Sequence, residues 1–279
     1  MTRAACLCLV AAAAPLWAFA HHDPETVIRA IDERVSTMPA TARDLTRRGD
    51  ELSALARYAE AAADYRRAIQ LDPAATTAHL GLCRALLEAG EHAGALAAAD
   101  AALAAVGDVP GVGAVYALRA AACERVGDDD AALAAWERAI SAERPEVDWL
   151  LAHASAAGRL AGPAAELRAL GAALEENGSV VLRRAWIAAS IRAGQAERVL
   201  PEIERKLQQS RHRSSWLLLL AEAQHAIGQP ERARQSAAEA VEELRRRVSV
   251  SGGNTALEGQ LTAAQGVVAR LDEQPPTAR

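Results

Sequence analysis

Two adjacent histidines near the amino terminus are the residues best placed to do chemistry. His21 and His22 are followed by Asp23. If the chain is cut after Ala20, His21 carries a free amine beside its own imidazole, and together these groups can chelate a copper-type ion. Such a short pair binds metal weakly without further ligands. Handling of a metal is therefore one alternative function. Five further histidines lack the spacing of a metal site: His79, His92, His153, His212 and His225.

Catalytic motifs are absent from the sequence. It contains no Gly-rich phosphate loop, no G-x-S-x-G elbow, no H-E-x-x-H and no C-x-x-C. Adjacent carboxylates such as Glu175 and Glu176 fall at expected helix ends, where charged residues are usually solvated. Trp149, Trp186 and Trp216 could stack on a sugar or a peptide, but at helical spacing such rings are more often packing residues. We expect neither catalysis nor a cofactor.

Residues 1–20 have the pattern of a secretory signal peptide. Arg3 is followed by an apolar run from Ala4 to Trp17 and by an A-x-A cleavage site at residues 18–20. The run is too short to span a bilayer comfortably, and no later segment has the required length, so no stable membrane insertion is expected after cleavage. We therefore expect a protein that is periplasmic or secreted, cut after Ala20.

Composition favours helices and disfavours nucleic acid as a partner. Of the 279 residues, 51% are hydrophobic but only 3% are aromatic, because alanine and leucine dominate; both are strong helix formers. The formal net charge is -5, and this mild acidity argues against nucleic acid as a partner.

A pattern of small and apolar residues returns about every 34 positions, as in helical solenoids. Leu45, Gly49, Ala61, Tyr65 and Ala68 define it first. Small residues at the facing positions let two helices approach closely. These small positions recur as Ala61, Ala68, Ala95, Ala102, Ala132 and Ala139.

These units resemble the tetratricopeptide repeat, a pair of antiparallel helices, over about three-quarters of the chain. The resemblance implies an all-α, right-handed superhelical solenoid of antiparallel helix pairs. An array of about six units is expected over residues 42–248. The fourth and fifth units are blurred, since Glu166, Val199 and Lys206 stand where small residues are usual. We interpret this blurred stretch as the loosest or most specialised part of the array.

Flanking segments complete the expected organisation. Residues 21–41 hold an amino-terminal capping helix that is half of a repeat, and residues 255–273 hold a carboxy-terminal capping helix. A linker at 249–254 and a disordered tail at 274–279 are also predicted.

In the tetratricopeptide family, ligands usually lie in the concave groove formed by the first helix of each unit. Arginines at such positions suit carboxylates, so the resemblance implies an acidic or carboxy-terminal peptide as ligand. The alternative is that these residues are ordinary solvated faces of amphipathic helices. The matching positions are Arg43, Asp50, Arg84, Glu88, Glu124, Arg125, Ser155, Arg159, Arg184, Arg192, Glu222 and His225.

The sequence thus predicts an exported, non-enzymatic scaffold or adaptor that binds a protein or peptide. Alternatives are metal handling through His21 and His22, and assembly of an envelope complex through the convex face. Cys83 and Cys123 fall on the first helices of neighbouring units. We expect them to be buried unpaired thiols, with a disulfide as the alternative.

Overall fold

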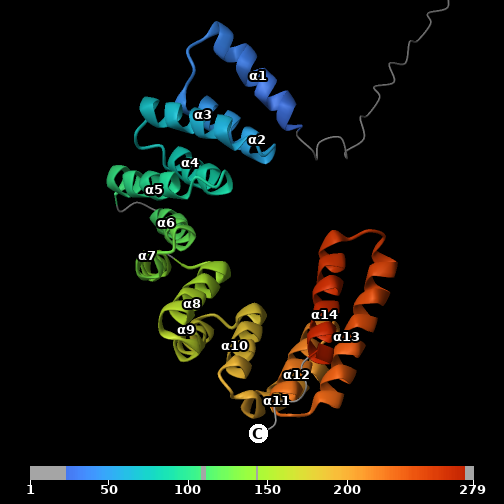
Figure 1. Ribbon diagram of the computed structural model, residues 1–279. Coiled ribbons are helices and arrows are strands. Elements are labelled where there is room, and N and C mark those ends of the chain that lie inside the picture. Colours follow the sequence, from blue (N-terminus) through green and yellow to red (C-terminus); the bar gives the residue numbers. More distant parts are fainter. Residues whose placement is uncertain (1–22, 108–110, 143, 274–279) are drawn as a thin grey trace, which may run out of the picture. The chain divides into compact units, whose positions relative to one another are not determined.

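A computed structural model describes residues 23–107, 111–142 and 144–273 of the chain. Within these residues the secondary structure is entirely helical, in fourteen α-helices (Figure 1). The predicted all-helical solenoid fold is therefore confirmed. The predicted signal peptide, the histidine pair and the tail at 274–279 lie outside the described residues.

The chain divides into two compact units at Val126 and Gly127. The division falls between the two helices expected to form the third repeat. Helices of the first unit are α1 (Pro24–Thr37), α2 (Ala42–Ala54), α3 (Tyr58–Leu71), α4 (Thr76–Glu88), α5 (His92–Val106) and α6 (Val112–Val126). Those of the second are α7 (Asp129–Ala142), α8 (Val147–Ala161), α9 (Pro163–Glu176), α10 (Val180–Arg192), α11 (Ala196–Gln209), α12 (Ser214–Ala226), α13 (Pro230–Ser251) and α14 (Thr255–Glu273).

Within each unit, consecutive helices pack on one another and alternate helices also touch. In the first unit α2 contacts α4, and α4 contacts α6. In the second unit α8 contacts α10, α10 contacts α12, and α12 contacts α14. Except for α14, the predicted capping helix, all of these helices are the first helices of predicted repeats. The first helices therefore form a continuous layer inside each unit, and their exposed side chains make a shared surface.

Small residues occupy the helix contacts as the sequence predicts. Ala61, Ala68, Ala102, Ala132 and Ala139 are each 0% exposed, since their side chains lie between closely packed helices. Ala95 is 1% exposed.

Tyr65 fills the space between the first two repeats. It is 2% exposed, and its ring lies against Gly49 of its own repeat and Gly81 of the next. A Cβ atom on Gly49 would stand 2.8 Å from the Tyr65 ring, inside van der Waals contact. The Tyr65 hydroxyl donates a hydrogen bond to Asp50 Oδ1 at 2.8 Å. Glycine is required at both positions because the ring occupies the volume of a side chain.

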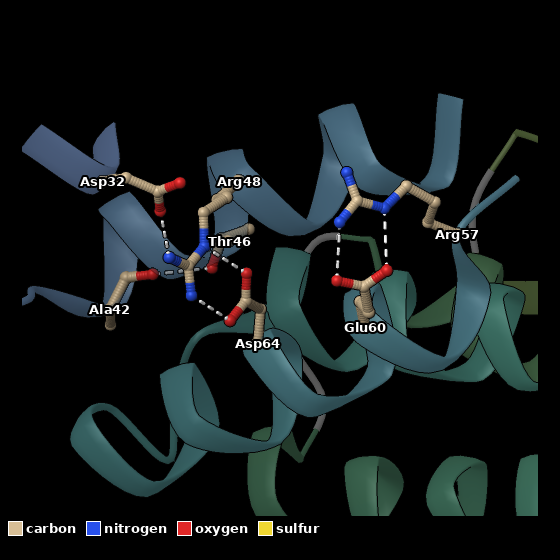
Figure 2. A network of polar contacts seen from close by, with 7 residues as sticks. All are labelled: Asp32, Ala42, Thr46, Arg48, Arg57, Glu60 and Asp64. Atoms are coloured by element: carbon tan, nitrogen blue, oxygen red, sulfur yellow. Dashed lines mark hydrogen bonds and ion pairs between the residues drawn. The ribbon is translucent and has the colours of Figure 1, made fainter. Parts of the chain in front are cut away.

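The first capping helix is attached to the array through Arg48 of α2 (Figure 2). Arg48 Nε and Nη2 donate to the two carboxylate oxygens of Asp64 on α3, both at 2.6 Å. Its Nη1 donates to Asp32 of α1. The side chains of Arg48 and Asp64 are only 22% and 10% exposed, and the bonds to both carboxylates raise the pKa of Arg48. Arg48 therefore joins three helices around one mostly buried charge.

Replacing Arg48 with methionine should lower the free energy of unfolding by about 1–3 kcal/mol, since it leaves the buried carboxylate of Asp64 without its partner. Amide protons of α1 should exchange faster while those of α4 and α5 keep their protection. Arg57→Met is the matched control: Arg57 binds Glu60 at 2.7 Å in an exposed pair (Figure 2), so its loss should leave exchange in α1 unchanged. Equal effects of the two substitutions on α1 would contradict this role of Arg48.

In the blurred fourth repeat, the small residue has moved to the other helix. A Cβ atom on Gly158 of α8 would stand 2.9 Å from Cβ of Glu166 on α9. The Glu166 carboxylate accepts a bond from Arg192 Nη2 of α10 at 2.6 Å. In the fifth repeat the large residue Val199 is itself buried, at 1% exposure. Larger side chains are thus buried in both blurred repeats. That this stretch is the loosest or most specialised part of the array stays a prediction.

Exchanging the small residue between α8 and α9 tests this interpretation. Gly158→Ala alone should cost about 1–3 kcal/mol by overpacking against Glu166. In a Glu166→Gly background the same substitution should become neutral or stabilising, because alanine is the better helix former by about 1 kcal/mol. Urea denaturation of the four proteins of this double-mutant cycle gives the coupling. Additive effects would show that the two positions do not share one volume.

The last joint is shorter than expected. The sequence predicts a linker at 249–254, but α13 continues through Ser251. Gly252 and Gly253 then adopt φ values of 61° and 99°, a left-handed conformation that glycine adopts without strain and that ends a helix. Asn254 caps α14, since its side-chain Oδ1 accepts from the Leu257 backbone N–H at 3.1 Å. The sequence did not predict that residues 249–251 are helical, because Ser-Val-Ser has no strong helix propensity.

Candidate peptide-binding surface

The layer of first helices carries a pocket where it meets α14, which we call the α14 pocket. Its volume is about 370 Å³, within the range of small-ligand sites. Three of the residues predicted from the sequence, Arg192, Glu222 and His225, lie together in it. Its lining consists of Ile191, Arg192, Glu222, His225, Ala226, Val267, Arg270 and Leu271.

Two polar side chains of the α14 pocket, Glu222 and His225, are partly buried. Burial raises the pKa of the Glu222 carboxyl, while the nearby charges of Arg270 and Arg192 oppose that rise. The Nδ1 atom of His225 is buried without a hydrogen-bond partner among the described residues. A partly desolvated carboxyl and an unsatisfied ring nitrogen beside an apolar wall are features of a binding site rather than of a solvated helix face.

Arg270 is the cation of the pocket that remains available. Within the described part of the chain it forms no ion pair, whereas Arg192 is bound to Glu166 at 2.6 Å. Sequence reasoning missed Arg270, because it lies on the capping helix and outside the repeat positions. Val267 and Leu271 of α14 supply the apolar wall beside it. The capping helix therefore contributes to a site as well as covering the end of the array.

Arg159 of the predicted groove set is held in contacts between side chains. Its Nε donates to Asp129 of α7 at 2.9 Å, and its Nη1 donates to Ser155 at 3.2 Å. The pair is 38–40% exposed at its side chains, so it contributes little stability. It does fix the direction of the guanidinium along the surface.

A second pocket lies on the first helices of the first unit. Arg43 and Asp50, both predicted from the sequence, line it together with side chains from α2 and from the start of α4, and its volume is about 380 Å³. Asp50 is also the acceptor of the Tyr65 hydroxyl. The buried packing of the repeat thereby orients one carboxylate of this surface.

The other predicted residues are spread along the helices. Arg84 and Glu88 are exposed on α4, Arg125 is exposed on α6, and Glu124 is half-buried beside it. Arg184 is exposed on α10. They lie along the surface of the first helices and do not gather into either of the two pockets.

The candidate metal ligands His21 and His22 lie outside the described residues. Among the residues that the structure describes, no cluster of three or more His, Cys, Asp or Glu side chains is suited to a metal ion. Cys83 is a free thiol at 1% exposure. Cys123 is equally buried. No described helix combines the length and the apolar character needed to cross a membrane.

Comparison with known proteins identifies the repeat. Residues 52–122 match the family model described as Tetratricopeptide repeat. A tetratricopeptide repeat protein from Parabacteroides merdae has a similar structure, with a TM-score of 0.56 at 16% identity over 87% of this chain and 93% of that one. The carboxy-terminal part of a TPR repeat-containing protein from Cytophaga hutchinsonii gives 0.54 at 14% identity, covering 92% of each chain.

A chain of the APC/C hetero-tetramer Cut9–Hcn1 also gives a TM-score of 0.54, at 14% identity, over 87% of this chain and 46% of that one. The search of curated proteins finds no match. At these identities the structural likeness defines the fold.

Proposed function

We propose that this tetratricopeptide-repeat protein is an exported, non-enzymatic adaptor that binds an acidic segment of a partner protein along its first helices. Binding of protein partners is the usual role of the fold, and the chain similar to it in the Cut9–Hcn1 hetero-tetramer belongs to a protein assembly. Export, to the periplasm or outside the cell, rests on the pattern of residues 1–20.

The single observation that carries the proposal is the α14 pocket. Arg270, which forms no ion pair with a described residue, offers its guanidinium beside the apolar side chains of Val267 and Leu271. Its planar fork suits a carboxylate. The pocket therefore fits a peptide carboxylate next to an apolar side chain. Glu222 opposes such a ligand when ionised, so the raised pKa of its carboxyl favours binding.

Capture of partners from the native envelope tests this function through opposite substitutions. Arg270→Gln should reduce retention of the partner about tenfold, the effect of losing one charged hydrogen bond. Glu222→Gln should increase retention, because it removes a negative charge from the pocket. Arg66→Gln is the control, since Arg66 is exposed on α3.

The direction of the Glu222→Gln effect is diagnostic. A partner that binds through a basic segment would be lost with Glu222→Gln and retained with Arg270→Gln. That result would contradict the acidic ligand. Partners retained equally by all three variants would contradict the pocket as the binding site.

A further inference from the structure

A second cavity in the second unit, which we call the basic pocket, lies where the α11–α12 turn meets the end of α13. Its volume is about 560 Å³, and it shares no lining residue with the α14 pocket. Its lining consists of Arg211, His212, Arg213, Glu243, Arg246, Arg247, Val250, Ser251 and Leu257.

Charge in the basic pocket is reversed relative to the protein as a whole. Four arginines and one glutamate line it, a formal charge of +3, whereas the chain carries -5. The one carboxylate, Glu243, is already engaged: both of its oxygens accept from the backbone N–H of Arg213, at 3.0 and 3.1 Å. The guanidinium of Arg213 is paired with Glu239 at 3.0 Å. Glu243 thus fixes the turn, and no salt bridge joins it to the other arginines.

Three guanidinium groups have no acidic partner among the described residues. Arg211 and Arg247 form no side-chain hydrogen bond or ion pair with any described residue. Arg246 donates only to the backbone carbonyl of Glu242, at 3.3 Å. Like charges gathered around one cavity repel each other unless an anion lies between them. Acidic residues also lie in this part of the chain, such as the exposed Glu231, which is paired with Arg234. The clustering of arginines is therefore a local feature and not the result of a basic protein.

The shape and lining of the pocket indicate the class of anion. Guanidinium forks donate pairs of parallel hydrogen bonds to phosphate and carboxylate oxygens. A peptide carboxylate carries one charge, whereas three guanidiniums around a single cavity match a compact group with two or more charges. Val250, which is 89% exposed, and Leu257 give the cavity an apolar side. We propose that the basic pocket binds a phosphate-type oxyanion carried by a molecule with an apolar portion, independently of the peptide surface.

Calorimetric titration of the full chain with inorganic pyrophosphate tests the site. Wild type should show saturable binding that weakens as salt is added. Arg211→Gln/Arg247→Gln should raise the dissociation constant at least about tenfold, because charge-assisted hydrogen bonds are lost. Neither arginine forms a side-chain hydrogen bond or ion pair with a described residue, so this variant should melt nearly like wild type. Arg66→Gln/Arg67→Gln is the control, with the same change in net charge at exposed positions of α3, and should bind like wild type.

Equal affinities of the two double variants, or no saturable binding by wild type, would overturn the proposal. So would binding of a glutamate-rich peptide at this pocket in place of pyrophosphate. Sedimentation with phosphatidylcholine vesicles containing phosphatidic acid identifies the source of the phosphate. Co-sedimentation that is lost in Arg211→Gln/Arg247→Gln indicates a lipid headgroup, and pyrophosphate binding without co-sedimentation indicates a free phosphate compound.

Discussion

Truncation of Tyr65 to alanine should lower the free energy of unfolding of the first unit by about 3–5 kcal/mol, the cost of emptying a large buried aromatic site. The ring lies between two repeats, against Gly49 and Gly81, so its loss weakens the repeat interface as well as one helix pair. Tyr65→Phe should cost only about 1 kcal/mol, because it removes the hydrogen bond to Asp50 and keeps the ring. Thermal and urea denaturation measure both values.

Gly81→Ala provides a sharper form of the same test, because its sign opposes helix propensity. Alanine in place of glycine normally favours a helix by about 1 kcal/mol. At Gly81, however, the new methyl group would overlap the Tyr65 ring, and we expect a net loss of about 1–3 kcal/mol. In the Tyr65→Ala background the substitution should become stabilising.

Gly94→Ala is the matched control for Gly81→Ala. Gly94 lies in α5, and a Cβ atom there would have its nearest neighbour at 3.7 Å, an ordinary contact. This substitution should stabilise the protein by up to about 1 kcal/mol. If Gly81→Ala and Gly94→Ala shifted stability in the same direction, the packing of Tyr65 between the repeats would be disproved.

Cys83 should react with thiol reagents about a thousandfold more slowly in the folded protein than in the unfolded chain. Burial raises the pKa of its thiol to about 12 from an ordinary value of 9.0, and only the thiolate is nucleophilic. A pKa that is higher by about three leaves about a thousandfold less thiolate at neutral pH. Mass spectrometry of the tryptic peptide 68–84, which contains no other cysteine, follows the labelling.

Labelling of the same peptide after denaturation without reductant tests the state of the thiol. Full labelling is expected for a free Cys83, whereas protection that only a reductant removes would show a disulfide.

Burial of the Cys83 thiol also makes the free energy of unfolding depend on pH. The folded state holds the Cys83 proton more tightly than the unfolded chain, so this contribution is complete below about pH 9 and is lost as the pH rises towards 12. Cys83→Ala should reduce that alkaline loss.

The repeat was predictable from sequence because its physical cause is local. Close helix contact demands a small side chain wherever the pattern recurs, and Ala61 and Ala132 are fully buried in this way. The same pattern locates the first-helix positions, which is why Arg192, Glu222 and His225 could be identified before their meeting in one pocket was known. Periodicity therefore predicts both the packed face and the opposite face of a helix.

Features that depend on pairing across helices could not be predicted. Gly158 compensates for Glu166, but the periodic pattern of α9 alone shows only a defect at Glu166. Arg270 reaches the α14 pocket from outside the array, so no repeat position corresponds to it. The basic pocket combines a turn with the end of α13, two segments that a repeat alignment treats as ordinary connections and solvated surface.

Site-specific photocrosslinking tests the central claim, that a partner segment binds on the first-helix surface at the α14 pocket. A photoreactive residue in place of Ala226, which lines the pocket and is exposed, should form an adduct with the partner. The same residue in place of Glu231, exposed at the start of α13, should not, and Arg270→Gln should abolish the adduct at position 226. Equal adducts at both positions, or an adduct at position 226 that persists in Arg270→Gln, would contradict the proposed binding surface.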